Sequence, residues 1–167
     1  YPIVCLLFLL SFLVGEVYAQ QKPVRILAIG NSFSQDAVEQ YLHELADAED
    51  IPTIIGNITI GGCSLERHLR NARTNDSVYR YHKIGLNGKK VETKKVTMGM
   101  ALADEEWDYV SLQQVSSSSG MYETFKASLP ELVKYVKARL PKRTQLMLHQ
   151  TWAYDANATN PGFKNYN

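Results

Sequence analysis

The chain has 167 residues, a formal net charge of +1 and 21% charged residues. This near-neutral balance, without a basic stripe that carries interleaved aromatic residues, argues against a nucleic-acid-binding protein. The length fits a single domain.

The N-terminal segment has the pattern of a secretory signal peptide. Residues 3–14 are almost continuously apolar, and residues 17–19 (Val-Tyr-Ala) offer a cleavage position. An apolar run of about 12 residues is too short to cross a bilayer, which needs about 20. We expect residues 1–19 to be a signal peptide that is clipped before Tyr1, with an uncleaved anchor as the alternative, and residues 20–167 to be the mature domain. The protein would then be secreted, periplasmic or at a bacterial cell surface.

The mature part begins with strands that alternate with helices. Val24–Ile29 is a continuous apolar run, typical of a strand buried on both faces of a parallel sheet. The pattern of residues 36–48 predicts one helix. Its apolar face would be formed by Ala37, Tyr41, Leu45 and Ala48. A second strand is predicted at Thr53–Ile60, and a helix capped by Ser64 at Leu65–Ala72.

The segment at about 78–97 interrupts this alternation. Two polar strands flank Asn87-Gly88, which is a strong signal for a two-residue hairpin turn. We interpret the segment as an inserted hairpin that forms a flap. Its excess of lysine and arginine favours selection of an acidic substrate or, as the alternative, a solvated hairpin whose lysines discourage edge pairing.

The remaining segments return to the strand and helix pattern. Asp108–Val115 is a third buried strand, Tyr122–Leu140 a helix that contains Pro130, and Thr144–Trp152 a fourth strand. This order indicates an α/β fold, a doubly wound, flavodoxin-like three-layer sandwich with a mostly parallel sheet. Because no further helix follows the fourth strand, we expect the domain to be truncated at its C-terminus.

Polar residues follow each predicted strand, where open parallel sheets bind their ligands. These clusters are Gly30-Asn31-Ser32, Gly61-Gly62-Cys63-Ser64, Gln113-Gln114 and His149-Gln150-Thr151-Trp152. Ser32 offers a hydroxyl before a helix N-terminus, Gly62 an open backbone N–H and Gln113 an amide donor. A serine with two such donors is the composition of an acyl-transfer site with an oxyanion hole.

Three motifs at these positions resemble a known family. GNSFS (30–34), IGGCSLERHL (60–69) and DYVSLQQ (108–114) are similar to the first three blocks of the SGNH (GDSL-like) hydrolases, above all to a bacterial branch of secreted proteins that carry GNSFS. The resemblance implies that Ser32 is the catalytic nucleophile. It also implies an oxyanion hole made of the Ser32 and Gly62 N–H groups and the Gln113 amide. The implied activity is a secreted serine esterase that removes acyl groups, such as acetyl, from carbohydrate.

The motifs also depart from the family pattern. GNS replaces the commoner GDS, LQQ replaces a Gly-x-Asn-Asp block, and the Asp-x-x-His block that carries the general base does not occur in the 167 residues. We expect that base beyond residue 167, so these residues alone would be inactive. Asn31, Gln114, Trp152 and Tyr154 are further candidates for binding a small-molecule or glycan ester. No cofactor is implied.

Structural alternatives stay open for each candidate. Ser32 and Ser34 could both cap the helix, Gly62 could serve a tight turn, and the glutamines could bind neighbouring backbone. Two other classes of function also stay open. One is a non-catalytic carbohydrate-binding relative of the same fold, and the other is a flavodoxin-like binder of a phosphorylated ligand.

The histidines and the cysteine give weaker signals. His149 is a poor candidate for the base, because the fourth strand lies about 10 Å from the first. His43, His68 and His82 are expected at the surface, and Cys63 is expected to pack rather than react. No histidine–carboxylate cluster has metal-ligand spacing, so no metal site is predicted.

Overall fold

A computed structural model describes residues 21–152, 154, 155 and 157–159; the predicted signal peptide lies outside them. The strands are β1 (Val24–Gly30), β2 (Thr53–Thr59), β3 (Tyr79–Ile84), β4 (Lys90–Val96), β5 (Tyr109–Gln113) and β6 (Gln145–His149). The helices are α2 (Ser32–Glu39), α3 (Leu42–Asp47), α4 (Leu65–Thr74), α5 (Met98–Asp104), α6 (Tyr122–Lys137) and the short 3₁₀ helix η1 (Ser116–Ser118). Within this part of the chain, no helix is long and apolar enough to span a bilayer.

The six strands form one sheet in the order β4-β3-β2-β1-β5-β6. Strands β2, β1, β5 and β6 pair in parallel, and β3 and β4 are added beyond β2 by antiparallel pairing. The strand order reverses at β1, which has β2 on one side and β5 on the other. In this fold class the reversal opens a ligand-binding crevice at the carboxyl ends of the strands. The predicted doubly wound α/β fold is confirmed.

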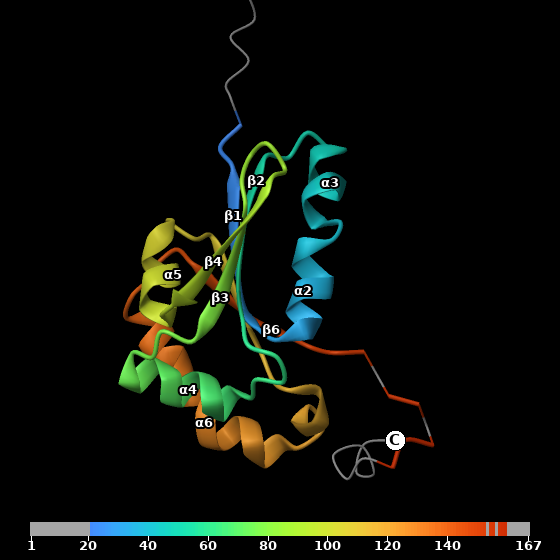
Figure 1. Cartoon of the computed structure of the whole chain (residues 1–167), viewed down its shortest axis with the longest axis vertical. Coiled ribbons are helices and arrows are strands. Elements are labelled where there is room, and N and C mark those ends of the chain that lie inside the picture. The colour runs from blue at the N-terminus through green and yellow to red at the C-terminus, as the bar shows by residue number, and fades with distance from the viewer. Residues whose placement is uncertain (1–20, 153, 156, 160–167) are drawn as a thin grey trace, which may run out of the picture.

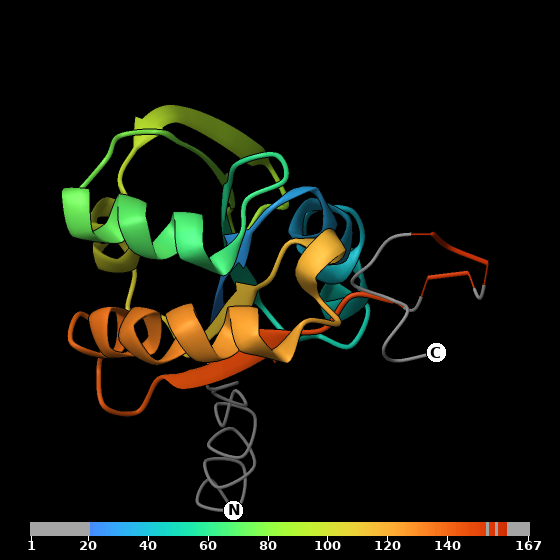
Figure 2. The same cartoon turned by 90° about the horizontal axis from the view of Figure 1, so that it is seen from below.

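Helices cover both faces of the sheet and give three layers (Figure 1). Helices α2 and α3 lie on one face, while α4, α5 and α6 lie on the other, with α4 and α6 side by side (Figure 2). Strand β1 contributes to both sides. Its Leu27 and Ile29 enter the larger apolar core with α4, α5 and α6, whereas Ala28 enters a smaller cluster with Val38 of α2.

The single helix predicted at residues 36–48 is wrong in both extent and orientation. The chain forms two helices, α2 and α3, with a break between Glu39 and Leu42. The predicted apolar face points to solvent, since Tyr41 and Leu45 are 68% and 66% exposed. The buried positions are instead Val38 and His43. The break shifts the helical phase, so one 3.6-residue repeat cannot describe the whole segment.

The hairpin near residues 78–97 is present as β3 and β4, but it is not a separate flap. Strand β3 pairs along β2, so the hairpin extends the main sheet. Its turn is a three-residue loop, 86–88, closed by a bond from the Gly85 N–H to the Lys89 carbonyl, with Gly88 at φ +69°. The left-handed third residue is typical of such loops and differs from the predicted two-residue turn.

Helix α5 has no counterpart in the sequence-based prediction. Thr97 caps it, because its side chain accepts a hydrogen bond from the Met100 N–H. The helix buries Ala101 and Leu102 against the sheet. Beside it, the buried indole of Trp107 donates to the Ala101 carbonyl at 2.9 Å. This segment completes the larger core beneath β2.

Candidate functional site

Ser32 is the first residue of α2. This helix follows β1 at the carboxyl end of the parallel strands (Figure 1). Asn31 caps this helix, because its Oδ1 accepts a hydrogen bond from the Phe33 N–H at 3.1 Å. Ser34 points inward and its hydroxyl lies 2.7 Å from the Asn31 carbonyl. Ser32 is exposed, and its hydroxyl makes no hydrogen bond to any described residue. Helix capping therefore does not explain why a serine stands at position 32.

Gly30 fixes the path of the backbone into this helix. A Cβ at position 30 would lie 2.7 Å from both Gln113 Oε1 and Ser34 Oγ, so only glycine fits. The Asn31 N–H donates to Gln113 Oε1 at 3.3 Å, which ties the loop to the end of β5. The Ser32 N–H is at the first helical position, which has no acceptor within its own helix.

Gly62, the second predicted donor, lies in the loop after β2. It is exposed with φ +63°, a left-handed conformation that favours glycine, and no atom lies within 4 Å of where its Cβ would be. Within the described residues nothing accepts a hydrogen bond from its N–H. The Asn31 side-chain amide donates to the Cys63 carbonyl at 3.2 Å, which holds this loop beside the Ser32 loop.

Cys63 is buried beneath that loop. Burial raises the pKa of its thiol to about 11, against the opposing effect of the nearby Arg67 and Arg70. A thiol is a nucleophile only as the thiolate, so Cys63 is a packing residue rather than a second nucleophile.

The two glutamines at the end of β5 are buried and differ in their bonding. Gln113 Oε1 accepts the Asn31 N–H, and its Nε2 is buried without a partner among the described residues. Gln114 Oε1 accepts the Leu65 N–H at 3.0 Å, and its Nε2 donates to the Thr124 hydroxyl at 3.0 Å. These bonds fasten β5 to the starts of α4 and α6. The amide of Gln114 is thus engaged on both sides, whereas Gln113 keeps a donor below the Ser32 loop.

An aromatic pair flanks Ser32. The Phe33 and Trp152 rings have centroids 4.6 Å apart and are inclined at 60°. Trp152 is 64% exposed, and Tyr154 is half-buried. Trp152 therefore packs against Phe33, the residue after Ser32 in the chain, and its role in binding substrate stays a prediction.

No described histidine hydrogen-bonds to Ser32. His43, His68 and His82 are buried, so their predicted surface location is wrong. His68 lies 3.0 Å from the Tyr79 hydroxyl, and burial, helped by Arg67, lowers its pKa to about 3. His149 ends β6 opposite Gln113, and partial burial lowers its pKa.

Sequence reasoning missed a line of polar groups beneath α2, which is buried at His82 and reaches the surface at Glu92. His82 Nδ1 lies 2.7 Å from Glu39 Oε1, and His82 Nε2 lies 2.9 Å from Glu92 Oε2. The hydrogen bond from His82 lowers the pKa of Glu92. The length of the hairpin loop was the signal that could have predicted this pairing. A three-residue loop centred on Asn87 places His82 opposite Glu92. The predicted two-residue turn would place His82 opposite Thr93.

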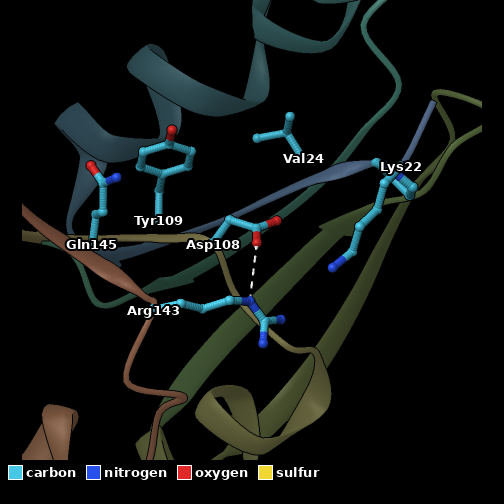
Figure 3. Close-up of a pocket in the computed structure, with 7 residues that line it drawn as sticks. Lys22, Val24, Asp108, Tyr109, Arg143 and Gln145 are labelled. Carbon is cyan, nitrogen blue, oxygen red and sulfur yellow. Dashed lines mark ion pairs between the residues drawn. The ribbon is translucent and has the colours of Figure 1, made fainter.

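A pocket at the other end of the sheet is a different candidate site (Figure 3). It is lined by Lys22, Pro23, Val24, Asp108, Tyr109, Arg143 and Gln145. Arg143 lies 3.7 Å from Asp108 and 2.8 Å from Glu106, so its charge is already paired. The pocket also lies at the amino ends of the parallel strands, away from the crevice. In the described residues, no three histidine, cysteine or acidic side chains gather as a metal site would require.

Comparison with known proteins identifies a family. No curated protein matches this chain. One solved structure is similar to this chain: the crystal structure of a DUF4886 family protein from Bacteroides uniformis ATCC 8492 at 1.50 Å resolution. The two chains are 61% identical in sequence, and their structures superpose with a TM-score of 0.82. The likeness covers 87% of this chain and 56% of that one, so the chain spans a little over half the length of that relative. Residues 25–167 match the domain of unknown function DUF4886, and the chain belongs to this family.

Proposed function

We propose that the protein is a secreted SGNH-type serine esterase that removes acyl groups from carbohydrate, with acetyl as the first candidate. Ser32 Oγ attacks the ester carbonyl while a general base takes its proton. The Ser32 and Gly62 N–H groups and the Gln113 amide stabilise the oxyanion. When the tetrahedral intermediate collapses, the bond to the sugar oxygen breaks and that oxygen takes the proton from the base. Water, which gives a proton to the same base, then hydrolyses the acyl-serine ester and restores the Ser32 hydroxyl.

The observation that carries this proposal is the uncommitted hydroxyl of Ser32. Asn31 provides the cap and Ser34 makes the inward bonds, so Ser32 has no structural task among the described residues. It nevertheless begins a helix at the strand-order reversal, where the N-terminal dipole favours developing negative charge. An exposed serine at this place is suited to attack a bound ester.

The arrangement of the neighbouring loops supports the oxyanion hole. Asn31 bonds to Gln113 and to the Cys63 carbonyl, so one residue fastens all three predicted donor segments together. The base is the missing component. The SGNH resemblance assigns it to a histidine in a later Asp-x-x-His block, and none of the four histidines of this chain lies in such a block.

The test is labelling and turnover of the full-length protein with a fluorophosphonate and a short-chain aryl acetate. Ser32→Ala should abolish labelling and lower kcat by at least about 10³-fold. The matched control is Ser117→Ala. Ser117 is an exposed serine in η1, after β5, and its replacement should leave both labelling and kcat unchanged. Turnover that survives Ser32→Ala would reject Ser32 as the nucleophile.

A non-catalytic carbohydrate-binding protein is the second candidate, favoured by the exposed Trp152 ring beside Phe33. Such a protein would bind glycan without reacting with the fluorophosphonate. Trp152→Ala should then weaken glycan binding, while Ser32→Ala should not. Labelling of Ser32 in the same preparation would decide for the esterase.

A further inference from the structure

A line of hydrogen bonds runs from the first turn of α2 across the sheet. Ser34 Oγ lies 2.9 Å from Asn57 Oδ1, and Asn57 Nδ2 donates to Glu39 Oε1 at 2.7 Å. The same Glu39 oxygen lies 2.7 Å from His82 Nδ1, and His82 Nε2 lies 2.9 Å from Glu92 Oε2. We call these five residues the polar network.

Strand register aligns the polar network beneath α2. Asn57, His82 and Glu92 are direct cross-strand partners on β2, β3 and β4. Such partners project from the same face of the sheet, which here is the face that α2 covers. Ser34 is in the first turn of α2 and Glu39 is its last residue. Asn57 therefore bonds to both ends of the helix.

Both ring nitrogens of His82 have a partner in the network. Its Nδ1 faces Glu39 and its Nε2 faces Glu92, each within hydrogen-bond distance of a carboxyl oxygen. Lys90 Nζ lies 3.4 Å from Glu39 Oε2. The Glu39 side chain is 4% exposed, so water cannot readily replace a lost partner.

Helix α2 has few apolar contacts that could hold it instead. Of its eight residues, Ser34 and Val38 are buried. The apolar cluster beneath it consists of Ala28, Val38, Ile55 and Ile84, with Leu42 at its margin. Apolar contacts are non-directional, whereas hydrogen bonds depend steeply on distance and angle. The polar network is thus the part of this interface that can fix the helix in one position.

We propose that Glu39 and His82 are positioning residues for Ser32. The polar network sets the place of α2 on the sheet, and the start of α2 sets the place of the Ser32 hydroxyl. This inference rests on the esterase function proposed above. The β3–β4 hairpin then supports the nucleophile from behind the helix instead of contacting substrate.

The experiment compares His82→Ala and Glu39→Gln with wild type in the full-length protein, well below the melting temperature of each variant. Both should lower kcat and the fluorophosphonate labelling rate by about 10- to 100-fold with little change in KM, because a small displacement of a reacting group has that effect. The matched control is Lys83→Met. Lys83 is next to His82 on β3 but pairs with Asp104 and Glu105, so kcat should be unchanged.

A second readout does not depend on activity. Hydrogen exchange of the α2 amides should be at least about 10-fold faster in His82→Ala, while α4 amides and the Lys83→Met protein stay as in wild type. Glu39→Gln keeps the side-chain shape, so it tests the network even if His82→Ala fails to fold. Wild-type kcat and wild-type α2 exchange in the variants would overturn the inference. An inactive wild type with fast α2 exchange in the variants would reject the esterase and retain the polar network as what holds α2.

Discussion

Helices α4, α5 and α6 cover one face of the sheet through a continuous apolar core, whereas α2 covers the other mainly through hydrogen bonds. Each face also contains a buried histidine. His68, on the larger core, bonds to a tyrosine hydroxyl, and burial lowers its pKa to about 3, so it is neutral near pH 7. His82, under α2, lies between two carboxylates.

The difference lies in the partners of the two imidazoles. In the larger core the packing is apolar and non-directional, and burial disfavours the charged form of His68. On the α2 face each ring nitrogen of His82 lies within hydrogen-bond distance of a carboxyl oxygen, and such bonds depend steeply on distance and angle. This is the face whose helix begins with Ser32.

Truncation in the larger core should give the largest effect. Trp107 is fully buried, so Trp107→Ala should lower the free energy of unfolding by about 3–5 kcal/mol through lost burial and a cavity. Urea denaturation measures this loss. The control Tyr41→Ala, at a residue 68% exposed, should change it by about 0.5 kcal/mol or less. Equal losses in the two variants would contradict the view that the larger core dominates stability.

The second prediction concerns the neutral His68. Between pH 6.5 and about 3 the unfolded chain binds a proton at this residue that the folded protein excludes. Stability must then fall as the pH falls, by up to about 1.4 kcal/mol per pH unit from this group. His68→Gln should remove this contribution. The unfolding free energy of wild type should therefore fall by about 2.5 kcal/mol more than that of the variant between pH 6 and pH 4. If the unfolding free energies of wild type and His68→Gln changed with pH in parallel, the folded protein would bind a proton at His68 as readily as the unfolded chain does, which would contradict the lowered pKa.

A substitution on the α2 face should lower the free energy of unfolding by less, and the loss should be confined to α2. Ser34→Ala removes the hydroxyl whose single proton faces both the Asn31 carbonyl and Asn57 Oδ1, so a buried acceptor loses its donor, which should cost about 1–3 kcal/mol. Urea denaturation measures the loss, and hydrogen exchange should locate it in α2 rather than in α4. The control is Ser117→Ala, which removes an exposed hydroxyl. A loss spread evenly over both faces would mean that Ser34 does not act on α2 in particular.

The smallest effect is expected when the folded protein is treated with an alkylating reagent that targets Cys63. Because burial raises its pKa to about 11, iodoacetamide at pH 8 should leave the thiol unmodified in the folded protein and alkylate it in urea. Peptide mass spectrometry resolves this cysteine. Rapid modification of the folded protein would show that the loop after β2 opens readily.

Continuous apolar runs and short motifs could be read from the sequence, whereas features that depend on register could not. Val24–Ile29 is apolar throughout, which predicts a buried strand wherever it lies in a sheet. The glycine and serines after it predicted that Ser32 lies next to a helix N-terminus, but the helix begins at Ser32 itself, four residues before the predicted start. The burial of His82 could not be predicted, because one extra residue in the turn decides whether Glu92 or Thr93 faces it. Residues 36–48 failed because polar His43 is buried there while apolar Leu45 is exposed.

The close packing around Gly30 determines which substitutions the protein can accept at that position. Gly30 and Ser32 should respond differently in a saturation library that is sorted separately for expression and for activity. Any side chain at Gly30 would collide with Gln113 and Ser34, so that position should fail both sorts. Replacements of the exposed Ser32 should pass the expression sort and, if it is the nucleophile, fail the activity sort. Two positions separated by one residue would in this way distinguish the requirements of folding from those of catalysis.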